Sequence, residues 1–598
     1  MGLSSFAFGQ CNVKHNSCSK HDYIYRAFVA DVLARLPGCE TPVAYESLLI
    51  PGTPANGDLV LPVPRLRIKG KKPAEQSAEL AAAFPDNHPL FQKPVTAGIH
   101  LPFFTPLSLP RLVLPYIFQR QQSYGNDSDV GLRNYAAPDQ GRKKEFHAGH
   151  LRSTIIGAFT ANLYETMGWD VVEVNYLGDW GKQFGLLAVG WQRFGSEEEL
   201  AREPLKHLLD VYARINTVFR PEQEESKKAR DEGRDTAEIE FRGLFAERNA
   251  FFSRMEAGDQ EAVALWRRFR DTSIDRYIAT YARLNIDFDE YSGESQVNRA
   301  TIEWVESVLR EKGIYEQNKG SWVIDFEKHG FKSLGLAVVR GRTGTTTYLL
   351  RDVAAVLDRV EKYAFDKMIY VISTEQDLYF RRVFRTVELM GRPDLAARLQ
   401  HVNFGKSREA MHEVMRRNEV KYSQVEDPDA VAEKVGISAV MVQNMSGKCI
   451  NNYPFDIGRM TSFEGDTGPY LQYCHARLNS ILRKADLTRQ DLVDHLENHP
   501  DSLDADVLGG KPHAADLLRL MAQYPDVTAV ALKTLEPSTI LTYLFRLAHQ
   551  LSSYYDVLQV VGAESGRDVV LARAALYEGA RQVLERGMRL LGLNPVEG

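Results

Sequence analysis

The sequence has few cysteines, no long apolar run and no excess of basic residues. Five cysteines in 598 residues cannot form the disulfide framework of a secreted protein, which indicates a reducing compartment. No apolar run approaches the roughly 20 residues that cross a bilayer, and the N-terminus lacks the basic start and apolar core of a signal peptide. We therefore predict a cytoplasmic protein with no membrane partner, and leave mitochondrial import open.

The charge pattern excludes little. A net charge of −6 argues against a uniformly basic surface, although a local basic face remains compatible with it. The segment RLRIKGKK, residues 65–72, is such a candidate, either for phosphate contact or as a solvated edge strand. Cys11, His15, Cys18 and His21 lie close in sequence but lack a zinc-finger spacing, so we predict no metal site.

The patterning changes twice along the chain, and one core rarely grows beyond about 250–300 residues. Residues 1–135 mix a helical pattern with short strand-like runs, which predicts an α+β module. Residues 136–435 alternate apolar strands with helices, which predicts an α/β domain with a parallel sheet, and a charged stretch at about 195–300 is interpreted as a helical insertion. Residues 436–598 show almost only helical periodicity, typical of an all-α bundle.

The stretch KEFHAGHLRSTIIGAF, residues 144–159, places His147 and His150 at the start of an apolar-periodic helix without a glycine-rich phosphate loop. A helix N-terminus can itself bind phosphate, because its first N–H groups are free. The histidines would add donors, and Gly149 would let a base approach the backbone. Two histidines near a helix start also occur by chance, so the motif alone decides nothing.

Polar residues also follow the predicted strands. GDWGKQFG comes after VVEVNYL, and Gln376 and Asp377 come after KMIYVIS, at the strand ends where parallel sheets bind ligands. Tyr348 and Asp352 are four residues apart and share a helix face. A carboxylate beside an aromatic ring suits a planar guanidinium, although a structural role for either residue fits equally well.

Several long motifs together resemble those of arginyl-tRNA synthetases, class I enzymes, of the eukaryotic and particularly the fungal type. They are FHAGHLRSTIIG, NYLGDWGKQFGLLAVG, TYARLNIDFDEYSGESQV, LQHVNFG, SFEGDTGPYLQYCHARL and RQVLERGMRLLGLNPVEG. The resemblance covers about residue 20 to the C-terminus. It implies a Rossmann-type catalytic domain, an N-terminal domain that binds the tRNA elbow and a helical C-terminal domain that binds the anticodon.

The resemblance also implies roles for individual residues. Tyr348, Asp352 and Gln376 match the arginine pocket of the family. His147, Gly149, His150, His401, Val402 and Gly405 match its ATP site, and Lys144, His147 and His150 are its catalytic candidates. The expected reaction joins L-arginine to tRNA(Arg) and uses ATP and Mg²⁺. The resemblance also implies a monomer, and a mechanism without a covalent protein nucleophile.

Two departures from the family stand out. The family carries a strand and a Ser-Ser-Pro-Asn turn before H-x-G-H, whereas GRKK here leads into EFHAGH, so we expect both to be missing. The family continues after HVNFG into a loop of the Lys-Met-Ser-Lys-Ser type, whereas HVNFGKSREAMHEVM here leads into a helix with Lys406 as the nearby lysine. A gene-model error, a tRNA- or arginine-binding paralogue without activity, and a different chemistry all fit these departures. Another H-x-G-H nucleotidyltransferase is the remoter alternative.

Overall fold

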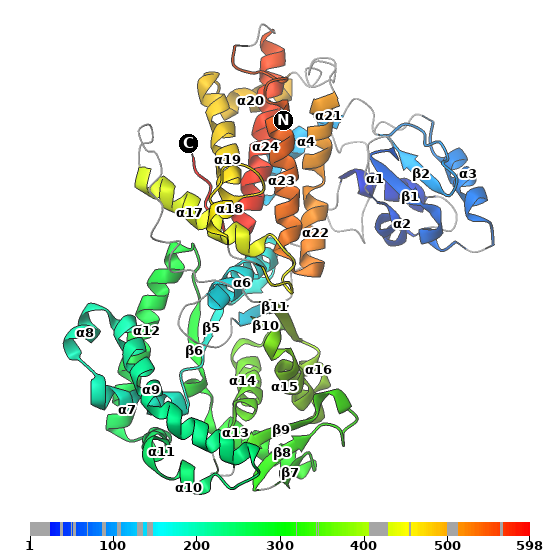
Figure 1. Ribbon diagram of the computed structural model, residues 1–598. Helices are drawn as coiled ribbons and strands as arrows, with labels where there is room; N and C mark the ends of the chain where they lie inside the picture. Colours follow the sequence, from blue (N-terminus) through cyan, green and yellow to red (C-terminus); the bar gives the residue numbers. More distant parts are fainter. Residues whose placement is uncertain are drawn as a thin grey trace.

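The computed structural model describes residues 24–35, 40–49, 51, 56–68, 70–86, 91–104, 109–127, 135–139, 148–318, 320–341, 344, 346–405, 428–453, 456–498, 512–562 and 566–597. In Figure 1 an α/β region lies beneath a helical bundle, and a small N-terminal module lies beside that bundle. Cys11, His15, Cys18, His21, Lys144, His147 and Lys406 lie outside the described residues. No helix in the described ranges is long and apolar enough to cross a membrane.

The N-terminal module is α+β, as predicted. Its two strands, β1 (Leu59–Pro62) and β2 (His100–Phe103), pair antiparallel. Helices α1 (Ile24–Ala34), α2 (Thr41–Ser47) and α3 (Pro73–Ala83) and the short 3₁₀ turn Val63–Leu66 pack around them. The module is attached to the bundle by ion pairs, from Arg26 to Asp526 (3.0 Å) and from Arg519 to Asp58.

A six-stranded parallel sheet forms the centre of the α/β region, in the order β11-β10-β3-β5-β6, with β4 also paired to β3. The interior strand β10 reads KMIYVIS and is buried along nearly its whole length, as expected for a strand covered on both faces. The strands are β3 (Tyr135–Asp139), β4 (Asp170–Val171), β5 (Val174–Leu177), β6 (Glu290–Gly293), β10 (Lys367–Ser373) and β11 (Leu399–Phe404).

The position of β3 corrects one expectation. We expected the strand before H-x-G-H to be missing, but β3 occupies the middle of the sheet, between β10 and β5. Its sequence, YAAPD, stands ahead of GRKK in the chain. The strand was not predicted because alanine and proline give a weak strand pattern. A strand therefore precedes the histidine motif, whereas the sequence contains no Ser-Ser-Pro-Asn turn.

Helices and a second sheet surround the parallel sheet. The helices are α6 (Ala148–Thr166), α13 (Arg299–Glu311), α14 (Tyr348–Tyr363), α15 (Asp377–Leu389) and α16 (Pro393–Ala396), with 3₁₀ turns Glu294–Gln296, Lys332–Leu334 and Thr374–Gln376. Strands β7 (Tyr315–Asn318), β8 (Ser321–Asp325) and β9 (Leu336–Arg340) form an antiparallel sheet that we did not predict. It packs with α13 and α14 in an apolar core that also includes residues of β10 and α15.

The charged stretch forms helices between β5 and β6. They are α7 (Lys182–Phe194), α8 (Glu197–Arg202), α9 (Pro204–Asp231), α10 (Ala237–Glu240), α11 (Gly243–Glu256) and α12 (Gln260–Arg283). Their apolar faces bury small separate cores, one of which centres on Ile215, Phe219 and Phe245. The outer faces carry ion pairs such as Arg268 to Glu197.

The C-terminal region is helical, as predicted. It contains α17 (Pro428–Met445), α18 (Ile457–Met460), α19 (Gly468–Lys484), α20 (Arg489–Asn498), α21 (Pro512–Ala522), α22 (Tyr524–Thr534), α23 (Pro537–Tyr554) and α24 (Arg567–Leu590). Helix α4 (Leu109–Arg120) and the 3₁₀ turn Gln121–Ser123 also pack on this bundle, although they precede residue 135. Tyr124 donates a hydrogen bond to the carbonyl of Met521 (3.0 Å).

Candidate active site

The helix that carries the histidine motif starts at the carboxyl edge of the parallel sheet. Helix α6 begins at Ala148 and follows the central strand β3, so Gly149 and His150 lie in its first turn. The carboxyl ends of parallel strands share one edge, where open α/β sheets bind their ligands. The free N–H groups of this turn can bind an anion there.

The predicted arginine pocket is divided between two neighbouring helices. Tyr348 is the first residue of α14 and is 42% exposed, whereas Asp352 lies one turn later and is 7% exposed. The Tyr379 hydroxyl of α15 donates a hydrogen bond to Asp352. Gln376 ends the 3₁₀ turn before α15, three residues ahead of Tyr379. The structure thus brings Asp352 to the segment that contains Gln376.

Glu294 and Arg351 form a buried ion pair beside Tyr348, which was not predicted from the sequence. Glu294 follows β6 directly and accepts hydrogen bonds from Arg351, Nε at 3.2 Å and Nη2 at 3.0 Å. The Arg351 guanidinium also lies 5.0 Å from the centre of the Tyr348 ring. This corner of the site therefore already holds a guanidinium between a carboxylate and an aromatic ring. The rule that identified Gln376, a polar residue just after a parallel strand, would also have identified Glu294.

The predicted ATP residues of β11 contact the adjoining elements. The His401 ring is 3.0 Å (Nε2) from the Ile372 carbonyl and 3.3 Å (Nδ1) from Asp377, and it stacks on Phe380. Val402 is buried in the strand, and Gly405 follows it and donates its N–H to the Cys449 carbonyl at 2.8 Å. Because both His401 nitrogens contact protein atoms, a hydrogen bond from this ring to ATP requires one of these contacts to be exchanged.

The loop GDWGKQFG is fixed by Asp179, which is 3% exposed. Its carboxylate accepts hydrogen bonds from Arg270 Nε (2.6 Å), Ser295 N–H (2.9 Å) and the Ser295 hydroxyl (2.7 Å). A Cβ at Gly293 would clash with this carboxylate, so glycine is required there. Asp179 therefore joins the ends of β5 and β6 to α12 of the helical insertion.

A cation lies where α7 begins, directly after this loop. Lys182 is the first residue of α7, and burial together with the nearby Arg248 lowers its pKa. The pKa of Arg248 is lowered as well, chiefly by burial. Positive charge is thus concentrated at the carboxyl end of β5, where it suits an anionic ligand.

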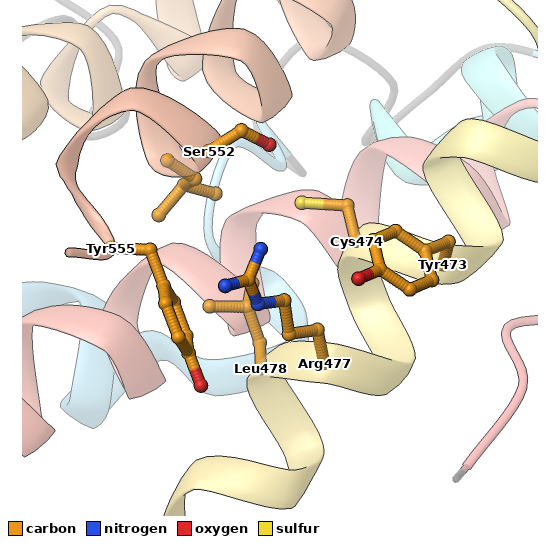
Figure 2. Close-up of a pocket in the computed structure, with 7 residues that line it drawn as sticks. Tyr473, Cys474, Arg477, Leu478, Ser552 and Tyr555 are labelled. Atoms are coloured by element: carbon orange, nitrogen blue, oxygen red, sulfur yellow. The ribbon is translucent and has the colours of Figure 1, made fainter. Parts of the chain in front are cut away.

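A small pocket lies in the bundle between α19 and the end of α23 (Figure 2). Its lining includes Tyr473, Cys474 and Arg477 from α19 and Ser552 and Tyr555 from the α23 side. The Arg477 guanidinium lies 3.4 Å from the centre of the Tyr555 ring, and Tyr473 is 51% exposed. Aromatic and guanidinium planes at a surface are the groups on which single-stranded bases stack.

Comparisons with known proteins agree with this arrangement. The model described as tRNA synthetases class I (R), catalytic domain, matches residues 118–409 and 406–457, and the DALR anticodon binding domain matches residues 471–598. The chain is 46% identical over 599 residues to the cytoplasmic arginine–tRNA ligase of Saccharomyces cerevisiae, covering 96% of this chain and 94% of the relative. It is 44% identical to a probable cytoplasmic arginine–tRNA ligase of Schizosaccharomyces pombe, covering 100% and 97%.

Fold similarity extends beyond close relatives. The arginyl-tRNA synthetase of Plasmodium falciparum superposes with a TM-score of 0.74 at 18% identity, covering 97% of this chain and 100% of that one. The catalytic family match consists of two stretches that overlap at residues 406–409. Matches to both family models and high identity over almost the whole length lead to one conclusion: this chain belongs to the arginyl-tRNA synthetase family.

Proposed function

We propose that this chain is an arginine–tRNA ligase, which activates L-arginine with ATP and transfers it to tRNA(Arg). One observation carries the proposal beyond family membership. The same sheet edge presents the first turn of α6, suited to phosphate, and the buried carboxylate of Asp352, suited to a guanidinium. A site that adenylylates arginine needs both.

In this proposal the arginine side chain binds at Asp352, with Tyr348 and Gln376 beside it. The Asp352 carboxylate is buried and accepts a hydrogen bond from Tyr379, and a carboxylate is the acceptor that suits a planar guanidinium. Glu294 and Arg351 form the neighbouring wall and orient the Tyr348 ring. The sequence contains no Ser-Ser-Pro-Asn turn, so the hydroxyls of that turn are absent, although β3 precedes the motif.

ATP binds in this proposal at the start of α6, with the adenine beside β11. The residues assigned to it are Gly149, His150, His147, His401, Val402 and Gly405, with Lys144 as a further cation. Mg²⁺ is expected to bind chiefly through the ATP phosphates and water, as this ion often does, and to neutralise their charge. Such binding needs no protein cage, and the described residues contain no group of three or more metal-ligating side chains.

The residues of this chain act by position and electrostatics. The arginine carboxylate attacks the α-phosphorus of ATP, pyrophosphate leaves, and the arginyl-adenylate then passes its arginyl group to a terminal ribose hydroxyl of the tRNA. In this proposal His147, His150 and the N–H groups of α6 stabilise the charge that develops on the phosphorus oxygens. Asp352 holds the guanidinium of the substrate arginine, so that the substrate's own carboxylate reaches the α-phosphorus of ATP.

For tRNA(Arg) we propose that residues 1–135 contact the elbow, that 136–435 form the catalytic domain and that 436–598 bind the anticodon, with α4 reaching from the first to the third. The exposed Tyr473 ring, beside Arg477 and Tyr555, supports base stacking on the bundle. By contrast, Arg581 and Arg589 pair with Glu585 within α24, which neutralises that helix face. We further propose that the chain is a monomer. We place its action in the cytoplasm, because two similar yeast ligases are named as cytoplasmic.

The decisive experiment is an arginylation assay of the purified chain with ATP, Mg²⁺, labelled arginine and tRNA(Arg), beside a tRNA of another specificity. Charging of tRNA(Arg) alone supports the proposal. Binding of tRNA(Arg) with no charging, under conditions in which a yeast enzyme is active, would replace it by the non-catalytic alternative.

A further inference from the structure

Arg152, in the first turns of α6, is a buried cation that the proposed chemistry does not use. It is 1% exposed, and the Glu536 carboxylate acts on it electrostatically. Its guanidinium donates to backbone carbonyls, Nη1 to Gly405 (2.6 Å) and Asn451 (2.8 Å) and Nη2 to Lys448 (3.5 Å). It also lies 4.8 Å from the centre of the Tyr453 ring. Burial lowers the pKa of this arginine.

A buried guanidinium whose hydrogen bonds, among the described residues, go to backbone carbonyls is a poor device for general stability. Removing a guanidinium from water carries a large desolvation cost, and an apolar side chain would fill the same space without it. The planar fork of arginine offers something else, because its five donors hold several acceptors in a fixed geometry. Here the acceptors come from two segments remote in sequence, the end of β11 and the residues before Tyr453.

These segments meet at close range. We call residues 446–453, which follow α17, the connector. Gly405 donates its N–H to Cys449 of the connector at 2.8 Å. A Cβ on Gly405 would lie 2.6 Å from Asn452 Oδ1 and 2.7 Å from the Asn451 carbonyl carbon, so only glycine allows this approach. Arg152 on α6 therefore binds both the end of β11 and the connector at the place where these two segments touch.

The connector also reaches the bundle. The Cys449 N–H donates to Glu536 Oε2 at 2.8 Å, and Glu536 directly precedes Pro537, the first residue of α23. Helix α23 contributes Ser552 to the pocket of Figure 2. A continuous set of contacts thus runs from α23 through Glu536 and Cys449 to Gly405, and from Gly405 to Arg152 on the motif helix.

We propose that Arg152 is a positioning residue for arginine activation: it holds the first turns of α6 in register with the end of β11, and Glu536 ties this register to the bundle. The inference rests on the proposed function, since the register matters only if ATP binds between α6 and β11. Arg152 does not touch the substrates. It acts through Gly405 and through the helix that carries His150, and so it affects the rate of activation rather than the binding of arginine at Asp352.

The test compares Arg152→Gln and Arg152→Lys with the wild type in arginine-dependent ATP–pyrophosphate exchange at saturating tRNA(Arg). Misplacing reacting groups by about 1 Å costs on the order of 10²-fold. We expect Arg152→Gln to lower kcat by about that factor, with KM for arginine changed less than about twofold. Arg152→Lys should recover part of the loss, because an ammonium donates to carbonyls without reproducing the fork.

Arg581→Lys is the matched control, since Arg581 is a mostly buried arginine held by Glu578 and Glu585 within the bundle. It should lower the melting temperature and leave kcat unchanged. If Arg152→Gln does not fold, Arg152→Lys carries the test. An unchanged kcat in a folded Arg152 variant, or a loss confined to KM, would overturn the proposal.

Glu536 supplies the second arm. Glu536→Ala removes the acceptor of the Cys449 N–H, whereas Glu536→Gln keeps one. We expect Glu536→Ala to lower kcat by about tenfold and Glu536→Gln to keep a kcat near that of the wild type. The double variant Glu536→Ala with Arg152→Lys should lose less kcat than the product of the two single losses, because the effects of residues in one network are not additive. Multiplicative losses would refute the link to the bundle. A wild type that charges no tRNA would refute the proposed function itself and this inference with it, whereas an active wild type with equally active variants would refute only the inference.

Discussion

The hydroxyl of Tyr379 on α15 donates a hydrogen bond to the carboxylate of Asp352 on α14. This contact fixes the one buried carboxylate that we assign to the substrate guanidinium, and it joins the two helices that flank the pocket. Hydrogen bonding from tyrosine stabilises the ionised carboxylate without supplying a competing positive charge. The Tyr379 hydroxyl thereby orients the carboxylate.

Replacing Asp352 with Asn should weaken arginine binding selectively. Removing one partner of a desolvated charge pair costs about 2–5 kcal/mol, and ATP affinity should hardly change because Asp352 lies away from the phosphates. Calorimetric titration of each substrate measures both. Tyr379→Phe is the control, since it removes the hydrogen bond and keeps the charge, and should cost less. Arginine affinity equal to wild type in Asp352→Asn would assign Asp352 a structural role.

Tyr473 should contribute to tRNA affinity if the pocket in the bundle receives a base. Stacking of a base on an aromatic ring contributes about 1–3 kcal/mol. Tyr473→Ala should therefore weaken tRNA(Arg) binding by that amount, while exchange of pyrophosphate at saturating tRNA is retained. Binding is measured by filter retention over a salt series, with Val530→Ala, an exposed position on α22, as the control. Equal affinities for the two variants would place base recognition elsewhere.

Stability should fall with rising pH because of Glu173. Burial, together with nearby Glu165, Asp289 and Asp287, raises the pKa of this carboxyl to about 8 from an ordinary value of 4.5. Between these values the folded state holds a proton that the unfolded state has lost, so the free energy of unfolding decreases as pH rises from about 4.5 to 8. Glu173→Gln removes this dependence and should raise the melting temperature most at pH 8 and above.

Thermal unfolding of both proteins from pH 5 to pH 9 provides the measurement. Glu225→Gln, at an exposed ion pair in the helical insertion, controls for loss of a surface charge. Parallel pH profiles for the wild type and Glu173→Gln would show that Glu173 is ionised in the folded protein.

The parts that the sequence predicted well are those with strong periodicity or long motifs. β10 and the bundle helices have hydrophobic patterns that fit one environment each, a buried strand and a helix with one apolar face. β3 was not predicted, because YAAPD has no apolar alternation. It is a strand because it pairs with β10 on one side and with β5 on the other.

The contacts that organise the site could not be predicted from the sequence. Arg152 meets Gly405 across 253 positions, and Asp179 meets Ser295 across 116. Such pairings depend on how strands are ordered in the sheet, and no local pattern encodes that order. Glu294 was identifiable in principle by its place after β6, whereas its partner Arg351 was not.

Asp179 should be essential for the junction of the insertion with the sheet. Asp179→Ala leaves the largely buried Arg270 without its carboxylate, and breaking such a pair costs about 3–5 kcal/mol. Denaturant unfolding should show this loss, accompanied by weaker activity because the ends of β5 and β6 move. Arg268→Ala, on the same helix but in an exposed pair with Glu197, should change stability by less than about 1 kcal/mol. Similar small effects for both variants would show that the Asp179 network is not a stabilising element.

This protein should activate arginine more slowly than a variant into which a lysine-bearing loop is inserted after Gly405. The sequence KSREAMHEVM follows Gly405 in place of a Lys-Met-Ser-Lys-Ser-type loop, whereas a strand before the histidine motif is present as β3. Phosphoryl transfer depends on positioned charge, and loss of one preorganised contact typically lowers the rate by about 10²–10³. Inserting the loop of a yeast relative should restore this factor in pyrophosphate exchange while tRNA affinity stays constant, because the tRNA-binding regions are unaltered. The same loop with its lysines replaced by alanine separates charge from chain length. If this protein exchanges pyrophosphate as fast as the loop-inserted variant, Lys406 or another cation already serves the phosphates, and the segment after Gly405 is complete for catalysis.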